Sequence, residues 1–167
     1  MTLLQLNTIT TTERATLLFT CCGSTNWVNK LNKLFPFENE DQLLDAAHSV
    51  WENCSENDWL ESFQHHPKIG DMESLRKKFA STAQWAAGEQ AAVAEAETDV
   101  LEALANGNEA YEKKFGYIFI VCATGKSAKE MLQLLQQRLP NPLAKEIHIA
   151  MNEQMKITIL RLKKLLA

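Results

Sequence analysis

Helix-capping residues divide most of this chain into helical segments. Thr10 and Glu13 fit a capping box, in which each side chain bonds a free backbone amide at the start of a helix. The helix that they open is predicted to run to the vicinity of Cys22, because Gly23 supplies a common stop. Further caps, apolar faces at helical spacing and proline or glycine stops predict eight more helices. These span 24–34, 40–53, 55–65, 74–79, 89–104, 108–115, 127–139 and 142–167, with a turn at 106–108.

One stretch departs from the helical pattern, namely Phe119 to Ala123, whose composition is typical of a β-strand. No second strand is predicted to pair with it, so side chains, water or a ligand must satisfy its backbone N–H and C=O groups. The stretch forms either a ligand-binding wall or the beginning of the next helix, and the pattern favours neither. The predicted fold is therefore all-α: one domain over 1–167, a helical bundle of about eight to nine helices with one short extended segment near 118–123.

Charge and composition exclude several classes of protein. The 167 residues carry a net charge of −4 without a basic stripe, which argues against binding to nucleic acid or anionic membranes. The histidines lack the spacing of metal ligands, so no metal site is predicted. The cysteines show no CxxC pattern, and neither a signal peptide nor a C-terminal peroxisomal signal is present. We therefore expect a soluble cytoplasmic protein with reduced thiols.

A histidine held against a proline is the strongest candidate for chemistry. Pro67 fixes its own φ and biases His66 away from the α region, so an arriving helix should end at His65 with His66 extended at its rim. An imidazole on a stiffened backbone suits proton transfer at a fixed point. The alternative is a helix terminator followed by two solvated histidines.

Two other predicted helices place polar side chains on faces that are otherwise apolar. Glu89 lies four residues before Val93 of one apolar stripe, in the first helical turn, where it either carries chemistry or only complements the helix dipole. Gln90 beside it is a typical substrate-orienting group. Arg161 shares a largely apolar face of the last helix with Ile147, Met151, Gln154, Thr158 and Leu165. It either snorkels or pairs with a carboxylate, or it anchors a carboxylate or ureido oxygen of a substrate.

These residues, in this order and spacing, resemble the 2-oxo-4-hydroxy-4-carboxy-5-ureidoimidazoline (OHCU) decarboxylase family of purine catabolism. The resemblance covers nearly the whole chain and is most specific from Phe63 to Leu162. The matching fragments are His66-Pro67-Lys68-Ile69-Gly70, Glu89-Gln90, Tyr111 with Phe115-Gly116, Phe119 to Ala123, Arg138-Leu139 and Arg161-Leu162.

The resemblance implies an all-helical, cofactor-free and usually dimeric enzyme, which converts the OHCU intermediate of urate oxidation into (S)-allantoin and CO₂. It also implies that His66 and Glu89 are catalytic residues. The implied substrate-binding residues are Pro67, Ala86, Ala87, Gly88, Glu89, Gln90, Phe119, Ile120, Val121, Cys122, Ala123 and Arg161.

The sequence departs from the family pattern at Ala86, where the family often has serine. A hydroxyl contact is therefore absent, or Thr82 or a water replaces it. The resemblance further implies a homodimer whose ligand is a small ureidoimidazoline, with no nucleic-acid or membrane partner. The sequence contains no transthyretin-like hydrolase domain, so the preceding hydrolysis step is expected to come from another chain.

Two other functions fit parts of the pattern. A non-catalytic helical interaction module would explain the amphipathic helices, but it would not explain an acid, an amide and an arginine on apolar faces. A ureide hydrolase would use a His-Glu pair to activate water, and release of CO₂ without ring opening would exclude it.

Overall fold

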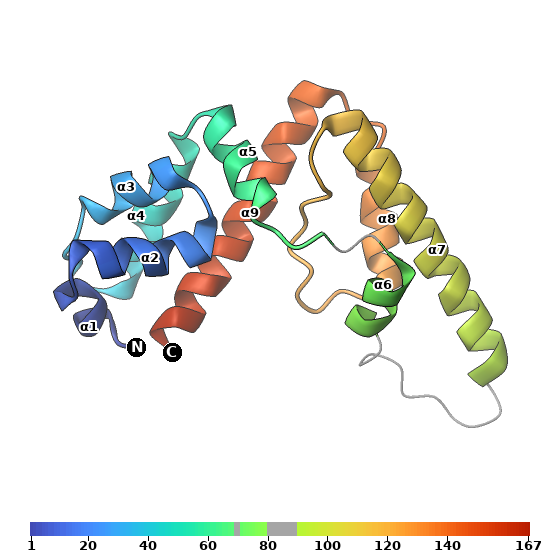
Figure 1. Ribbon diagram of the computed structural model, residues 1–167, viewed down its shortest axis with the longest axis horizontal. Helices are drawn as coiled ribbons and strands as arrows, with labels where there is room; N and C mark the ends of the chain where they lie inside the picture. Colours follow the sequence, from blue (N-terminus) through green and yellow to red (C-terminus); the bar gives the residue numbers. More distant parts are fainter. Residues whose placement is uncertain (69–70, 80–89) are drawn as a thin grey trace. The chain divides into compact units, whose positions relative to one another are not determined.

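The computed structural model describes residues 1–68, 71–79 and 90–167, with only the backbone described for 90–96. Within these residues the chain forms helices and no strands, which confirms the predicted all-α class. The nine helices of the described residues, drawn in Figure 1, are α1 (Leu3–Thr8), α2 (Thr11–Cys22), α3 (Thr25–Asn32), α4 (Glu40–Glu52), α5 (Glu56–Gln64), α6 (Met72–Phe79), α7 (Gln90–Phe115), α8 (Ala128–Arg138) and α9 (Leu143–Leu166).

Five helices begin where the capping residues predict. In each case the cap side chain accepts a hydrogen bond from the backbone amide three residues further on, which satisfies one of the free amides of the first turn. The short helix α1 is not among the predicted helices, although Thr2 and Gln5 form a capping box there. The five confirmed caps are Thr10, Ser24, Asn39, Ser55 and Ser127.

The predicted turn at 106–108 is wrong, because α7 runs through it without a break. A Cβ atom added at Gly107 would lie 2.5 Å from Cδ2 of Leu135 on α8. The glycine therefore permits close approach of the two helices, and this packing offsets its cost of about 1 kcal/mol in a helix interior. A local turn signal is overridden here by a tertiary contact.

Two further predictions concern segments between helices. The helix that Ser24 caps ends at Asn32 rather than at Leu34. The N–H of Leu34 donates to the carbonyl of Leu31 at 3.0 Å, three residues back, which forms a tight turn after the helix. Residues 118–123 are neither helix nor strand. The alternative that Phe119 to Ala123 begins the next helix is thus wrong, because α8 begins only at Ala128.

Contacts between residues divide the chain into two compact units, and each is described by itself. The first comprises Met1–His66, Ile120–Cys122 and Ile147–Ala167; the second comprises Pro67–Phe119 and Ala123–Glu146. The expectation of a single domain over 1–167 stays a prediction.

Two tryptophans anchor the core of the first unit. Trp27 and Trp51 are buried, and their indole N–H groups donate to the carbonyls of Ala47 (2.9 Å) and Met151 (2.8 Å). A buried indole gains apolar contact while its one donor stays satisfied. Since Met151 lies on α9 and Trp51 on α4, the second bond ties the last helix to the N-terminal helices.

The second unit is organised around a buried ion pair between α8 and α9. Glu146 is completely buried, and its Oε1 lies 2.5 Å from Nη2 and 2.7 Å from Nε of Arg138. The Tyr111 hydroxyl donates to the same carboxylate at 2.5 Å, and Nδ2 of Asn141 donates at 2.9 Å. These bonds offset the cost of removing two charges from water. Burial and the bond to Glu146 raise the pKa of Tyr111, so the hydroxyl stays a donor.

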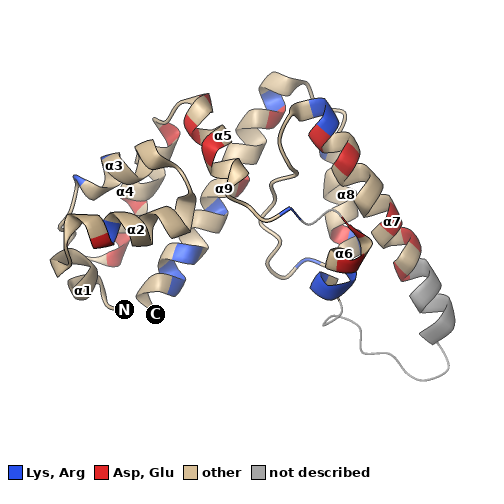
Figure 2. Cartoon of the chain, viewed as in Figure 1, with Lys and Arg blue, Asp and Glu red and all other residues tan. Residues whose placement is uncertain are grey.

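Charged side chains are spread over the helices of both units rather than gathered in one basic stripe (Figure 2). In the described part of the chain, no helix combines the length and the apolar character needed to cross a membrane.

Candidate functional site

His66 lies at the C-terminal end of α5, as the His-Pro step predicts. His65 caps the helix, and the N–H of His66 still bonds the carbonyl of Phe63 at 3.3 Å, but His66 itself is outside the helix. Its side chain is half-buried and Pro67 is exposed. The imidazole therefore sits at the rim of a helix on restricted backbone rather than in a long loop.

The C-terminal end of α2 holds the elements around His66 together. The last carbonyls of a helix lack partners within the helix. Here the Cys22 carbonyl accepts from the Ser62 hydroxyl of α5 and from Nε2 of Gln154 of α9 (3.3 Å). The neighbouring Cys21 carbonyl accepts from Nη1 of Arg161, also on α9, at 3.2 Å. The end of one helix thereby positions side chains from two others.

Gly23 permits this close approach. It ends α2 with φ +78°, a conformation that favours glycine. A Cβ added there would lie 2.8 Å from Cβ of His65. The His65 ring packs edge-on against Phe19 with ring centroids 4.8 Å apart. His65 is therefore a packing contact between α2 and the end of α5 that supports its neighbour His66.

The imidazole of His66 is held by Gln154, with a hydrogen bond between Nε2 of the ring and Oε1 of the amide. Gln154 is completely buried. Burial lowers the pKa of His66, the bond to Gln154 raises it in part, and the positive charges of Arg161 and His65 lower it further. The net direction is downward from 6.5, so the neutral imidazole predominates at neutral pH.

Arg161 lies close to His66 and keeps most of its hydrogen-bonding capacity. Its guanidinium is half-exposed, and within the described residues its one hydrogen bond is to the Cys21 carbonyl. Among the residues that the structure describes, no carboxylate lies within ion-pair distance of Arg161. A guanidinium has five N–H donors, so this arginine can still bind an anionic or carbonyl group.

Gln154 lies on the predicted face of Arg161, but it is not among the predicted site residues. Four members of this face, Ile147, Met151, Gln154 and Thr158, are buried, and the polar Gln154 and Thr158 are completely so. Their spacing of four residues on an apolar face is the signal that could have identified them.

The predicted wall near 118–123 is divided between the two units. In the first unit, the Cys122 N–H donates to Oε2 of Glu153 at 2.8 Å, so a side chain satisfies one amide that was predicted to face a ligand. In the second unit, Phe119 packs edge-on against Tyr111 (5.1 Å between ring centroids) and under the guanidinium of Arg138 (4.6 Å). Phe119 is therefore also part of the packing around the buried ion pair.

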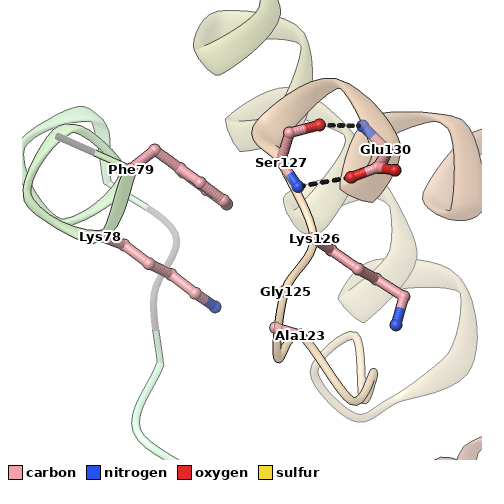
Figure 3. A pocket seen from close by; sticks show the side chains of 7 residues that line it. All are labelled: Lys78, Phe79, Ala123, Gly125, Lys126, Ser127 and Glu130. Carbon is pink, nitrogen blue, oxygen red and sulfur yellow. Dashed lines mark hydrogen bonds between the residues drawn. The ribbon is translucent and has the colours of Figure 1, made fainter. Parts of the chain in front are cut away.

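A pocket of about 350 Å³ in the second unit contains the last residue of this wall, Ala123 (Figure 3). Ser127 and Glu130 form one side of it, but their polar groups are used in the capping box of α8. The lining residues are Lys78, Phe79, Ala123, Gly125, Lys126, Ser127 and Glu130.

The remaining predicted site residues cannot be placed against His66. Ala86, Ala87, Gly88 and Glu89 lie outside the described residues, as does Thr82. Gln90 begins α7, but its side chain is not described. Their proximity to the imidazole stays a prediction.

The fold and the site define an all-α protein with a neutral histidine held at a helix end beside an arginine. The chain matches the family model described as OHCU decarboxylase over residues 7–163. It therefore belongs to the OHCU decarboxylase family.

Known proteins of this kind are similar over most of the chain. "Uric acid degradation bifunctional protein TTL" of Arabidopsis thaliana is 38% identical over 148 residues, which are 87% of this chain and 45% of that protein. "Uric acid degradation bifunctional protein" of Bacillus sp. (strain TB-90) is 28% identical over 166 residues, 99% of this chain and 32% of that protein. The chain thus spans less than half the length of these two curated relatives.

A solved structure resembles the fold as well. The crystal structure of OHCU decarboxylase in the presence of (S)-allantoin has a TM-score of 0.70 and 36% sequence identity to this chain. The match covers 89% of this chain and 95% of that one.

Proposed function

We propose that this chain catalyses the cofactor-independent decarboxylation of OHCU to (S)-allantoin and CO₂ in urate degradation. The observation that carries the proposal is the family match over residues 7–163, a span that contains His66 held by Gln154 at the end of α5. The 36% identical OHCU decarboxylase, solved in the presence of (S)-allantoin, supports the same ligand class.

The substrate supplies its own electron sink. Its carboxylate is β to a C=N group, so the electron pair of the breaking C–C bond moves into that group as CO₂ departs. The adjacent hydroxyl then loses its proton to become a carbonyl, and the former C=N carbon gains a proton that sets the configuration. One further proton is taken from solvent onto the ring nitrogen. The protein has to orient the substrate and deliver a proton to one face.

His66 is the group proposed to move this proton. As a neutral imidazole it accepts the hydroxyl proton and returns it to the neighbouring carbon. Arg161 anchors a carboxylate or ureido oxygen of the substrate through guanidinium N–H groups that the bond to Cys21 does not use. Glu89 places negative charge near the departing carboxylate or holds the hydroxyl and ureido groups. Pro67, 86–88, Gln90 and 119–123 complete the proposed substrate contacts.

The test uses OHCU generated freshly from urate, because this compound also decays spontaneously. The rate of its disappearance and the chirality of allantoin are followed by absorbance and circular dichroism, with and without the protein. We expect faster loss of OHCU and selective formation of (S)-allantoin. A rate equal to the spontaneous rate, with racemic product, would refute the activity.

Two substitutions test the roles. His66→Asn should abolish the acceleration and the stereoselectivity while the fold is kept, and His48→Asn on the exposed face of α4 is the matched control. Glu89→Gln keeps a hydrogen-bonding group but removes the charge. An unchanged rate in Glu89→Gln excludes the charge role, and near-normal turnover in His66→Asn excludes the assignment of His66.

We also propose that the protein acts in the cytoplasm as a homodimer. The resemblance to the family supports the dimer, and the buried free thiols of Cys21, Cys22 and Cys54 support a reducing compartment. Light scattering during size-exclusion chromatography measures the assembly. A mass of one chain at working concentrations contradicts the dimer.

A further inference from the structure

We infer that Gln154 is a positioning residue that keeps a proton on Nε2 of His66 and so assigns proton exchange with the substrate to Nδ1. This inference rests on the proposed function and goes beyond it, because it names which ring nitrogen reacts and what determines it. It follows from the hydrogen bonds around the buried amide of Gln154.

The orientation of that amide is determined by two acceptors. Its Nε2 lies 3.3 Å from the Cys22 carbonyl, which can only accept. It also lies 3.2 Å from the Thr158 hydroxyl, whose single hydrogen is donated to the backbone carbonyl of Gln154 at 3.0 Å. The hydroxyl oxygen is therefore an acceptor toward the amide. A flipped amide would place its oxygen against two acceptors in a completely buried position.

With both N–H groups of the amide used, Oε1 of Gln154 is left to face His66. An amide oxygen accepts and cannot donate, so Nε2 of His66 must carry the hydrogen of this bond. A neutral imidazole has one N–H, which leaves the lone pair on Nδ1. In the described part of the chain, no hydrogen bond to Nδ1 of His66 is recorded.

The surroundings keep His66 in the neutral form that this assignment needs. Among the residues that the structure describes, the charged and titratable groups that act on it are Arg161 from α9 and His65 from its own segment, and both are unfavourable to an imidazolium. Nδ1 can therefore accept a proton from the substrate and return it, while Nε2–H stays bonded to Gln154. This is the division of roles expected when one ring nitrogen is oriented and the other reacts.

The direct test is the tautomer of His66 in the intact protein. Long-range ¹H–¹⁵N correlation spectra of histidine-labelled protein, with His66 assigned by its loss in His66→Asn, report which nitrogen is protonated. We expect neutral His66 to be protonated on Nε2 and unprotonated on Nδ1. We also expect (S)-allantoin to shift the Nδ1 resonance more than the Nε2 resonance. A protonated Nδ1 in the neutral form, or a response to allantoin at Nε2 alone, overturns the inference.

Two variants separate positioning from packing. Gln154→Met keeps the volume but removes the amide, so both tautomers should appear and kcat should fall roughly tenfold or more. Gln154→Glu keeps an acceptor for Nε2–H but adds a charge that raises the pKa of His66, so the acid limb of the kcat profile should move to higher pH. Gln136→Met on the exposed face of α8 is the control.

The outcomes distinguish this inference from the proposed function. An unchanged His66 tautomer and titration in both Gln154 variants overturns the inference even where OHCU turnover is normal. The expected tautomer in a protein that does not accelerate OHCU loss refutes the activity and leaves the positioning by Gln154 standing. If Gln154→Met does not fold, the tautomer of His66 in the wild-type spectrum and the pH profile of Gln154→Glu still test the inference.

Discussion

Replacing Gly23 with alanine should weaken both the fold and the site. At φ +78° the new side chain is strained, and its Cβ would lie 2.8 Å from Cβ of His65. Ordinary contact begins at 3.4 Å, so the two atoms are about 0.6 Å too close. The Cβ of His65 is bonded to the backbone and cannot rotate away. The end of α5, which carries His66, therefore has to move.

The expected size of each effect follows from this geometry. The left-handed conformation costs a non-glycine residue roughly 1–2 kcal/mol, and the contact with His65 adds to that loss of stability. A misplacement of about 1 Å in an active site can cost about 100-fold in rate. For a shift near 0.6 Å we expect kcat to fall about tenfold. The effect on kcat should exceed the effect on substrate binding, because the shift displaces the group that moves the proton.

Gly116→Ala is the matched control. Gly116 has φ +81° with nothing within 4 Å of an added Cβ, so it carries the conformational cost without the contact. Urea unfolding followed by far-UV circular dichroism measures stability, and formation of (S)-allantoin from fresh OHCU measures kcat. We expect both variants to be destabilised but only Gly23→Ala to lose activity. Equal stability losses with unchanged kcat in both would refute the role of Gly23 in placing His66.

Two further predictions concern buried and titrating groups. Glu146→Gln leaves the buried Arg138 without its counter-charge, so it should lower the free energy of unfolding by about 3–5 kcal/mol. Tyr111→Phe removes only one hydrogen bond to Glu146 and should cost less, as measured by urea unfolding of both variants. A smaller loss in Glu146→Gln than in Tyr111→Phe would contradict the ion-pair role. Because the pKa of His66 is lowered by folding, the unfolded chain binds the proton more readily, so stability should fall as pH drops through about 6.5. His66→Asn should lessen this slope, and an identical pH dependence of stability in the variant would count against a lowered pKa.

The starts of the helices could be predicted because their signals are local. Thr10, Ser24, Asn39, Ser55 and Ser127 each bond an amide three residues away, so the few residues around each cap contain the whole interaction. The same holds for the end of α5, since Pro67 acts on the residue directly before it. Neither prediction needs any knowledge of the fold.

The errors arise where distant residues decide the local structure. The Asn-Gly pair at 106–107 is typical of a turn, but Gly107 is used for contact with Leu135 of α8, and no short stretch of sequence contains both. The buried role of Tyr111 likewise depends on Glu146, which lies 35 residues further along the chain. In each case the packing energy outweighs the local preference.

The candidate site shows the same division. The sequence by itself determined that His66 stands at the rim of a helix on stiffened backbone, because proline restricts its own and the preceding residue. Only the tertiary structure decided what that imidazole is bonded to. Gln154 lies 88 residues after His66 in the chain. The Cys22 carbonyl that orients the amide of Gln154 lies 132 residues before Gln154. Hydrogen-bond direction depends on which atoms meet in space, and the chain meets itself there only once α2, α5 and α9 have packed.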